Sequence, residues 1–189
     1  SGFIDHSTSQ YFPPIGDQMQ EGSCAAWSAA YYILGFYQAR ERGWDYTGQT
    51  INNTDPSTLI SPEFAYHLVN NGEDKGTNQY YIWELANIIG VSSLANMPYS
   101  DAHPHNNWPG EAAWREAPKY RTGNKIYYFE IDDMNDINAI KTLLEAGYLI
   151  SIAVDADQYN ADGLWTVGEY HAAEWGDLNH ANTLVGYED

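Results

Sequence analysis

In the N-terminal half of the chain, hydrophobic residues recur every three or four positions, which is typical of helices packed against a core. The longest such pattern covers residues 24–41, and Gly43 follows it as a stop signal. Ser61 followed by Pro62 is a strong helix start, because serine caps and proline favours the first helical position. The predicted helices occupy residues 24–41 and 62–69 and a third segment that is capped by Thr77 or Asn78 and runs to about Ile89. Residues 1–22, 44–60 and 92–118 are expected to be extended, loop-like or irregular.

The second half of the chain has short apolar runs that favour strands, separated by one helical segment. The predicted strands are Lys125–Ile131, Leu149–Val154, Trp165–Val167 and Ala181–Tyr187, and the helix starts at Asn135 or Asp136 and ends at Gly147. This order predicts an α+β protein with a helical N-terminal lobe and an antiparallel, sheet-rich C-terminal lobe. We expect one domain, residues 1–189, with the helical lobe at about 20–118 and the sheet-rich lobe at about 119–189 plus the N-terminal lead-in.

The charge of the chain excludes several classes of partner. With 26 acidic and 8 basic residues, the formal net charge is −18, which argues against binding to nucleic acid or to an anionic membrane surface. No apolar run approaches the ~18 residues that a membrane-spanning helix needs, so we expect no membrane insertion. Strong acidity favours solubility in a salty or extracellular setting, and we expect an extracellular or cell-surface location.

Two short features raise the question of a metal ion. Asp155–Asn160 partly resembles a calcium-binding loop but lacks the glycine expected at its sixth position. His103 and His105 flank a proline in a polar loop and make a poor metal pair, and His67 reads as a packing or surface residue. Because no phosphate-cradling glycine motif is present either, we expect no cofactor and no metal, with calcium as the open alternative.

The single cysteine is the most distinctive chemical group. Cys24 stands where the Gly22-Ser23 loop enters the predicted long helix, and the unpaired N–H groups of a helix N-terminus favour thiolate over thiol. Far downstream, His180 enters an apolar strand, and a cysteine and a histidine distant in sequence can meet as nucleophile and base. The alternative is that Cys24 is a small buried hydrophobic residue, as many free cysteines are.

Three sequence segments carry a resemblance to a known family. The sequence Glu21-Gly22-Ser23-Cys24-Ala25 shares the Gly-Ser-Cys core of the signature C-G-[SA]-C-[WY] and departs at both flanks. Gln18 lies six residues before the cysteine, and Asn179-His180 is followed by Leu184-Val185-Gly186-Tyr187. In these segments, and in order over nearly its whole length, the chain resembles the papain-like cysteine peptidases, in a bacterial or archaeal form without disulfides. In disulfide-bearing members, the position of Glu21 is a cysteine.

This resemblance implies a two-lobed papain-like fold with the active site in the cleft between the lobes. It also implies hydrolysis of a peptide or protein substrate through a thioester on Cys24, with His180 as base and acid, holding the thiolate as an ion pair. Gln18 would donate its side-chain amide to the oxyanion, beside the backbone N–H of Cys24. The same resemblance implies substrate-binding roles for Gly22, Ser23, Gly76, Thr77, Ala153 and Asn179.

The end of the sequence departs from the family pattern. The family has a third catalytic residue, an asparagine in an Asn-Ser-Trp-Gly type motif, and no such motif lies between His180 and Asp189. We therefore expect the last strands of the sheet-rich lobe to be missing, and we favour incompleteness because Gln18, Cys24 and His180 are retained. A second chain supplying the strands is one alternative. Others are a non-catalytic peptide-binding or adhesion module, and a Cys–His amidase or acyltransferase.

Overall fold

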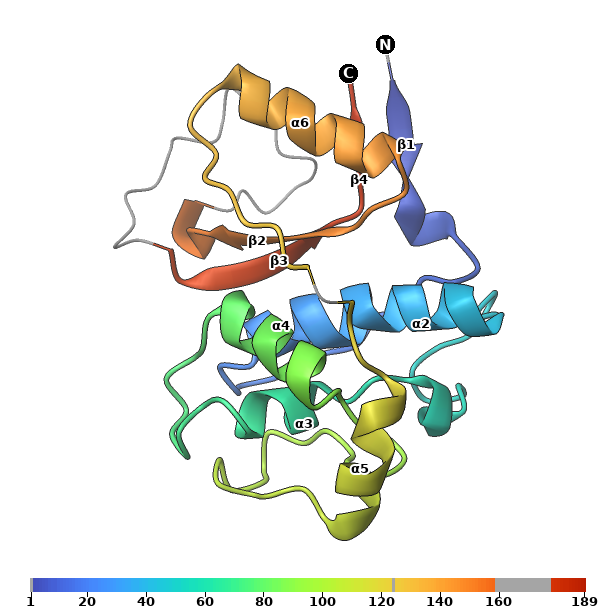
Figure 1. The fold of residues 1–189 in the computed structure, drawn as a ribbon, viewed down its shortest axis with the longest axis vertical. Helices are drawn as coiled ribbons and strands as arrows, with labels where there is room; N and C mark the ends of the chain where they lie inside the picture. Colours follow the sequence, from blue (N-terminus) through green and yellow to red (C-terminus); the bar gives the residue numbers. More distant parts are fainter. Residues whose placement is uncertain (1, 124, 159–177) are drawn as a thin grey trace.

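The computed structural model describes residues 2–123, 125–158 and 178–189. Helices α2 to α5 lie together in one half of the molecule, and strands β1 to β4 lie with helix α6 in the other half, where both chain ends are found (Figure 1). The strands in the described part of the chain form two small antiparallel sheets. The predicted α+β class, helical first and sheet-rich second, is confirmed. Among the described residues, no helix combines the length and the apolar character needed to cross a bilayer.

The predicted long helix forms as three consecutive stretches. These are α1 (Cys24–Ala26), the π-helical η2 (Trp27–Leu34) and α2 (Gly35–Arg42). The first N–H of α2 bonds to the carbonyl of Ala30, five residues earlier, which is the spacing of a π-helix. The helix ends at Gly43, which takes the left-handed conformation with φ 72°. Almost every side chain of η2 is buried, so this helix is the central element of the helical half.

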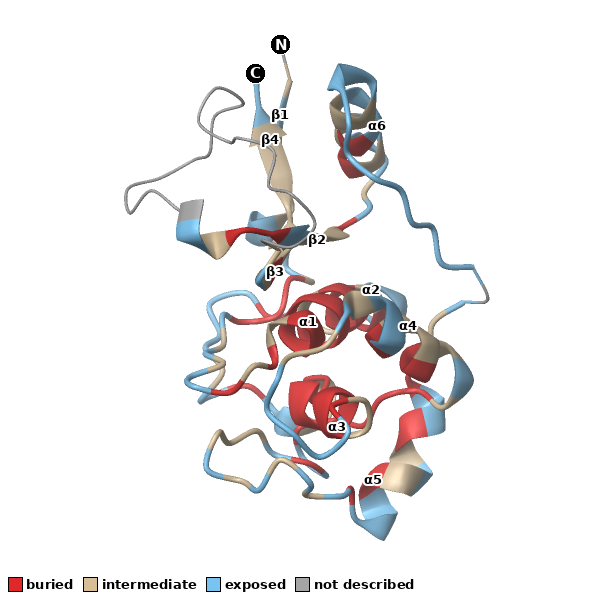
Figure 2. Ribbon diagram, turned by 90° about the vertical axis from the view of Figure 1, so that its left-hand side faces the viewer, coloured by how far each residue is buried: buried red, intermediate tan, exposed pale blue. Residues whose placement is uncertain are grey.

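Two shorter helices pack beside it as the local signals predict. Helix α3 (Pro62–His67) is capped by Ser61, whose hydroxyl accepts a hydrogen bond from the backbone N–H of Phe64. Helix α4 (Gln79–Ile88) is capped in the same way by Asn78. The largest hydrophobic core cluster joins α1, η2, α3, α4 and Ala181 of the sheet half. Figure 2 shows the same distribution, with buried residues concentrated in α1 and α3.

The structure corrects two predictions for the connecting segments. Helix α5 (Glu111–Glu116) forms inside the segment 92–118 that was expected to be irregular; it is only six residues long and lies between prolines, too short to show a period. Lys125–Ile131 forms no strand, and Tyr127 in it is 83% exposed. A strand needs a hydrogen-bonded neighbour, and none of the described strands pairs with this segment. The predicted strand at Trp165–Val167 lies outside the described residues.

Helix α6 (Met134–Glu145) begins slightly earlier than predicted. Asp133 is its cap, and the side chain of Asp136 bonds back to the backbone of Asp133, which completes a capping box. Among the described residues there are also four short 3-10 turns, η1 (His6–Thr8), η3 (Pro56–Thr58), η4 (Ala117–Lys119) and η5 (Ala156–Gln158).

The two sheets each contain two antiparallel strands. Strand β2 (Ile150–Val154) pairs with β3 (His180–Leu184), and β1 (Phe3–Asp5) pairs with β4 (Gly186–Glu188). The predicted strand Ala181–Tyr187 is therefore divided between β3 and β4. The division joins the N-terminal strand to the C-terminal one and leaves β3 free to lie against the long helix.

A buried hydroxyl cluster fastens the sheet to the long helix. The hydroxyl of Ser28 donates to the carbonyl of Asn182 at 2.8 Å, lies 2.7 Å from the hydroxyl of Ser151, and accepts from the hydroxyl of Thr183 at 3.1 Å. Ser28 is 2% exposed. Because these bonds lie about one helical turn beyond Cys24, they fix the distance and angle between the start of the helix and the start of β3.

Replacing Ser28 with alanine is expected to lower the free energy of unfolding by about 1–3 kcal/mol, because the buried groups that bond to this hydroxyl would be left without a hydrogen-bond partner. Chemical denaturation of the purified chain measures the change. Ser7→Ala is the control, because that exposed hydroxyl bonds only to nearby surface groups, and a change within about 0.5 kcal/mol is expected. Equal losses in both variants would show that the cluster does not hold the sheet in place.

Candidate active site

Cys24 is the first residue of the long helix. Ser23 precedes it as the cap, and the carbonyl of Ser23 accepts hydrogen bonds from the backbone N–H groups of Ala26 and Trp27 at 2.9 and 3.0 Å. The preceding loop is held by the backbone N–H of Gly22, which donates to the carboxylate of Asp74 at 2.7 Å. The thiol is therefore presented at a helix N-terminus, half-buried, on a loop fixed by a bond to a distant segment.

Strand β3 brings the start of the histidine segment to this helix. The thiol of Cys24 lies near the backbone of Ala181, the residue that follows His180, and this backbone group lowers the pKa of the thiol. Ala181 is buried in the same core cluster against which Cys24 packs. The two segments that are farthest apart among the predicted catalytic residues thus lie side by side.

The protonation of this pair is governed by burial. Burial raises the pKa of the Cys24 thiol, and the backbone hydrogen bonds with Ala181, with Ala25 and within Cys24 itself lower it by less. Burial also lowers the pKa of His180. Both shifts favour the uncharged thiol and the uncharged imidazole at neutral pH. The backbone N–H groups at the helix N-terminus lower the pKa of the Cys24 thiol, as the sequence predicts, but burial raises this pKa by more.

Gln18 lies in the loop before the nucleophile, with its side chain turned back onto that loop. The side-chain amide of Gln18 donates to the backbone carbonyl of Glu21 at 3.0 Å. The backbone carbonyl of Gln18 accepts a hydrogen bond from the hydroxyl of Tyr99 at 2.6 Å. The same hydroxyl lies 2.8 Å from the hydroxyl of Ser23. Burial raises the pKa of Tyr99 to about 12, so Tyr99 stays protonated and joins Gln18 to the helix cap. Sequence analysis assigned no such role to Tyr99.

The predicted glycines lie next to each other beside the nucleophile loop. A Cβ atom added to Gly22 would come within 3.1 Å of the backbone nitrogen of Gly76, and Gly76 has a φ of +75°. The N–H of Gly76 donates to the hydroxyl of Tyr66 at 3.2 Å, and that hydroxyl donates to Asp74 at 2.8 Å. The structure therefore brings Gly22, Gly76 and the adjoining Thr77 together through two residues, Tyr66 and Asp74, that sequence analysis did not single out.

The remaining two predicted residues lie on the sheet side. Ala153 is exposed on β2, where it is the register partner of Ala181. Asn179 turns its side chain towards the end of β2, because its carbonyl oxygen accepts from the backbone N–H of Ala156 at 2.8 Å and its amide donates to Asp155 at 3.3 Å. These bonds tie Asn179 to the residues that follow β2. Its role towards a substrate stays a prediction. Part of the calcium alternative, residues 159 and 160, lies outside the described residues.

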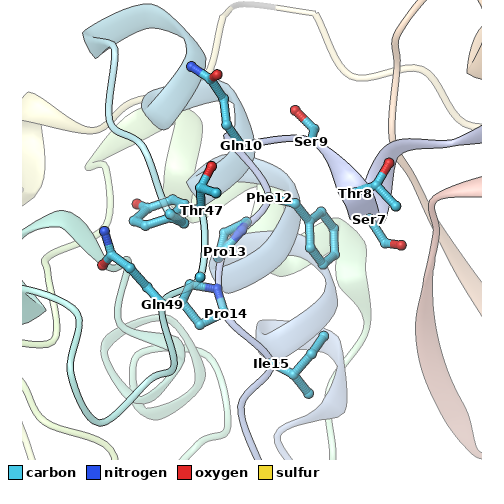
Figure 3. Close-up of a pocket in the computed structure, with 12 residues that line it drawn as sticks. Ser7, Thr8, Ser9, Gln10, Phe12, Pro13, Pro14, Ile15, Thr47 and Gln49 are labelled. Atoms are coloured by element: carbon cyan, nitrogen blue, oxygen red, sulfur yellow. The ribbon is translucent and has the colours of Figure 1, made fainter.

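A separate surface pocket of about 300 Å³ lies between the N-terminal lead-in and the loop after the long helix. Figure 3 shows its lining, with Pro13 and Pro14 at the centre and Thr47 and Gln49 beside them. None of the predicted site residues lines it, and it contains no charged side chain. It is therefore not the place where the predicted chemistry would occur.

Comparisons with known proteins agree with this geometry. The family described as "Papain family cysteine protease" matches residues 3–189. A comparison with curated proteins found no match. Among solved structures, xylellain, a cysteine protease from Xylella fastidiosa, matches with a TM-score of 0.65 and 18% identity, over 100% of this chain and 70% of that chain. Digestive procathepsin L 3 of the Tenebrio molitor larval midgut matches with a TM-score of 0.68 and 19% identity, over 99% of this chain and 55% of that one.

At these identities the solved structures show the fold alone, and the fold is papain-like, as the sequence predicts. The chain spans little more than half of the procathepsin chain it matches. The family match runs from the N-terminal strand to the last residue. The chain belongs to the papain family of cysteine proteases.

Proposed function

We propose that this chain is a cysteine-type peptidase in which Cys24 is the nucleophile, His180 is the base and acid, and Gln18 is an oxyanion donor. The single observation that carries the proposal is the placement of Cys24 at a helix N-terminus, packed beside strand β3, which begins at His180. A cysteine nucleophile with a base from a distant segment is the pattern of covalent catalysis, and this packing supports such a pairing.

The first half of the reaction forms a thioester. The sulfur of Cys24 attacks the carbonyl carbon of the peptide bond, and His180 takes the thiol proton, because both groups start uncharged. The carbonyl oxygen becomes an oxyanion, and the electron pair returns as the C–N bond breaks. His180 gives its proton to the leaving amine, and the acyl group stays on Cys24.

The second half hydrolyses the thioester. His180 takes a proton from a water molecule as its oxygen attacks the acyl carbon; the C–S bond then breaks, and His180 returns the proton to the departing sulfur, which restores the thiol and the neutral imidazole. The oxyanion of each step would accept from the backbone N–H of Cys24 and from Gln18. The amide of Gln18 has two N–H donors, of which one is used by the carbonyl of Glu21, so the other is the one assigned to the oxyanion.

Replacing Gln18 with alanine is expected to lower kcat by about 10²–10³-fold and to leave KM nearly unchanged, because the lost hydrogen bond is made mainly in the transition state. Gln20→Ala is the matched control, since Gln20 is an exposed glutamine in the same loop. Initial rates on one peptide substrate measure both. A Gln18→Ala enzyme as fast as the Gln20→Ala control would remove Gln18 from the oxyanion site.

Incubation with a peptide library, followed by mass spectrometry, tests the reaction itself. The proposal expects cleaved peptides with the free thiol and none after Cys24 has been alkylated with iodoacetamide. Peptides that bind but remain intact would favour a non-catalytic binding or adhesion module. Intact peptides together with turnover of small amides would favour an amidase or acyltransferase.

Substrate contacts are part of the same proposal. The backbone at Gly76 and Thr77 would bond to the substrate as a short added strand, next to Gly22 and Ser23 in the nucleophile loop. Ala153, small and exposed on β2, would leave room for a substrate side chain. We further propose a peptide or protein as the substrate and, on the strength of the net charge of −18, an extracellular or cell-surface location.

A further inference from the structure

Five titratable side chains gather beneath the nucleophile loop. Glu21 comes from the loop that leads to Cys24, Glu63 and His67 come from α3, and His103 and His105 come from the loop before α5. The side chains of Glu21, Glu63 and His67 are fully buried. Burying two carboxylates in a chain that is already strongly acidic is costly unless each is balanced by a cation or by hydrogen bonds.

The carboxylate of Glu63 is balanced in this way. One of its oxygens lies 2.5 Å from the ring nitrogen Nδ1 of His103 and 3.2 Å from the side-chain amide of Asn107. Its other oxygen accepts from the backbone N–H of Ser100 at 2.8 Å. Glu63 therefore needs no further partner.

The carboxylate of Glu21 has a partner at only one of its two oxygens. Its Oε1 lies 2.8 Å from Nε2 of His67 and 3.6 Å from Nδ1 of His105. Its Oε2 is buried with no hydrogen-bond partner, and Nδ1 of His105 is likewise buried without one. Buried polar atoms without partners are rare in folded proteins, and here two of them belong to neighbouring side chains.

The ring of His67 is oriented as metal-binding histidines usually are. Its Nδ1 lies 3.1 Å from the backbone carbonyl of Asn107, and its Nε2 lies 2.8 Å from the carboxylate of Glu21. Both neighbours are acceptors, so without a metal ion the ring donates from both nitrogens, and a metal ion at Nε2 would take the place of the proton there. A ring held by a carbonyl on one nitrogen presents the other nitrogen to a cation.

We propose that Glu21, His67 and His105 form a binding site for a divalent transition-metal ion of the zinc type. One ligand atom from each residue lies within 4.8 Å of the other two. Zinc binds nitrogen and oxygen at about 2.0–2.2 Å, which puts tetrahedral ligands about 3.3 Å apart, so small side-chain movements suffice. Two imidazoles and one carboxylate suit zinc, cobalt or nickel better than magnesium or calcium.

Such an ion would satisfy both unpartnered atoms and tie three segments together. It would join the loop before Cys24 to the end of α3 and to the loop that carries His105. Because the backbone carbonyl of Glu21 accepts from the side chain of Gln18, the ion would also fix the loop that holds the proposed oxyanion donor. Its role is to position these residues and not to react.

Zinc binding to the whole chain, freed of metal by dialysis against a chelator, tests the site. We expect a single Zn²⁺ ion per chain in a competition titration, and a melting temperature higher by about 5–10 °C with excess zinc. Cobalt in place of zinc should show the visible absorption of a tetrahedral site. No binding to the metal-free chain would overturn the proposal.

His105→Ala is the informative variant, because its ring is partly exposed and its loss is compatible with folding. It should weaken zinc affinity by about 100-fold or more. His103→Ala removes a neighbouring histidine that bonds to Glu63 instead and should keep the affinity of the wild type. Glu21→Gln, which keeps the shape of the side chain, should lose binding as His105→Ala does. Equal zinc binding in His105→Ala, His103→Ala and the wild type, with unchanged circular dichroism, would show that zinc binds elsewhere.

Discussion

Replacing Cys24 with alanine is expected to abolish peptide hydrolysis and to leave the fold intact. The sulfur atom is the proposed nucleophile, and losing the nucleophile of a catalytic pair lowers kcat by about 10⁴–10⁶-fold. Folding should tolerate the change, because Cys24 is only half-buried and alanine is favourable in a helix. Circular dichroism and the hydrolysis rate of one peptide substrate measure the two effects.

The double variant makes this prediction sharper. Cys24 and His180 act on the same proton, so His180→Ala should cause a loss of similar size, and the Cys24→Ala/His180→Ala variant should be no slower than either single one. Independent losses that multiply in the double variant would contradict a shared step. A His180→Ala enzyme within about tenfold of the wild type would contradict its role as base.

Replacing Gly90 with alanine is expected to lower the free energy of unfolding by about 3 kcal/mol or more. Gly90 follows α4 with a φ of +95°, and an added Cβ would lie 1.9 Å from the carbonyl oxygen of Ala117. The added Cβ would meet the backbone of Ala117, which cannot move aside as the end of a flexible side chain could. The variant would have to separate α4 from the turn after α5.

Gly48→Ala is the matched control for Gly90→Ala. Gly48 also has a positive φ, +68°, but an added Cβ would meet no atom within 4 Å. This variant carries only the backbone strain and should lose about 1 kcal/mol. Urea unfolding measures both free energies. Equal losses would mean that the close approach to Ala117 does not matter.

Local signals in the sequence were sufficient for most of the helices. Ser61 with Pro62, Asn78, and Gly43 with its left-handed backbone each act within a few residues of the helix end they set, so the sequence alone shows them. The predicted strand at 125–131 was wrong for the opposite reason. Its residues favour a strand, but a strand depends on a partner elsewhere in the chain.

Only those residues of the candidate site that lie in a recognisable sequence motif could be predicted. The Gly22-Ser23-Cys24 loop, Gln18 and His180 were identified from their order along the sequence. Tyr99 and Asp74, which hold that loop in place, come from other segments, and the sequence analysis assigned no role to either side chain. Glu21, His67 and His105 come from three separate elements, so only the folded chain shows that they meet. The charge states of Cys24 and His180 depend on burial, which the helix-terminus argument did not include.

The most direct test of the proposed chemistry is the intact mass of the chain after incubation with an epoxysuccinyl inhibitor of papain-like peptidases. The proposal predicts one adduct per chain in the wild type and none in Cys24→Ala, formed faster than with a model thiol at the same pH. Labelling no faster than the model thiol, under reducing conditions, would contradict the assignment of Cys24 as an activated nucleophile.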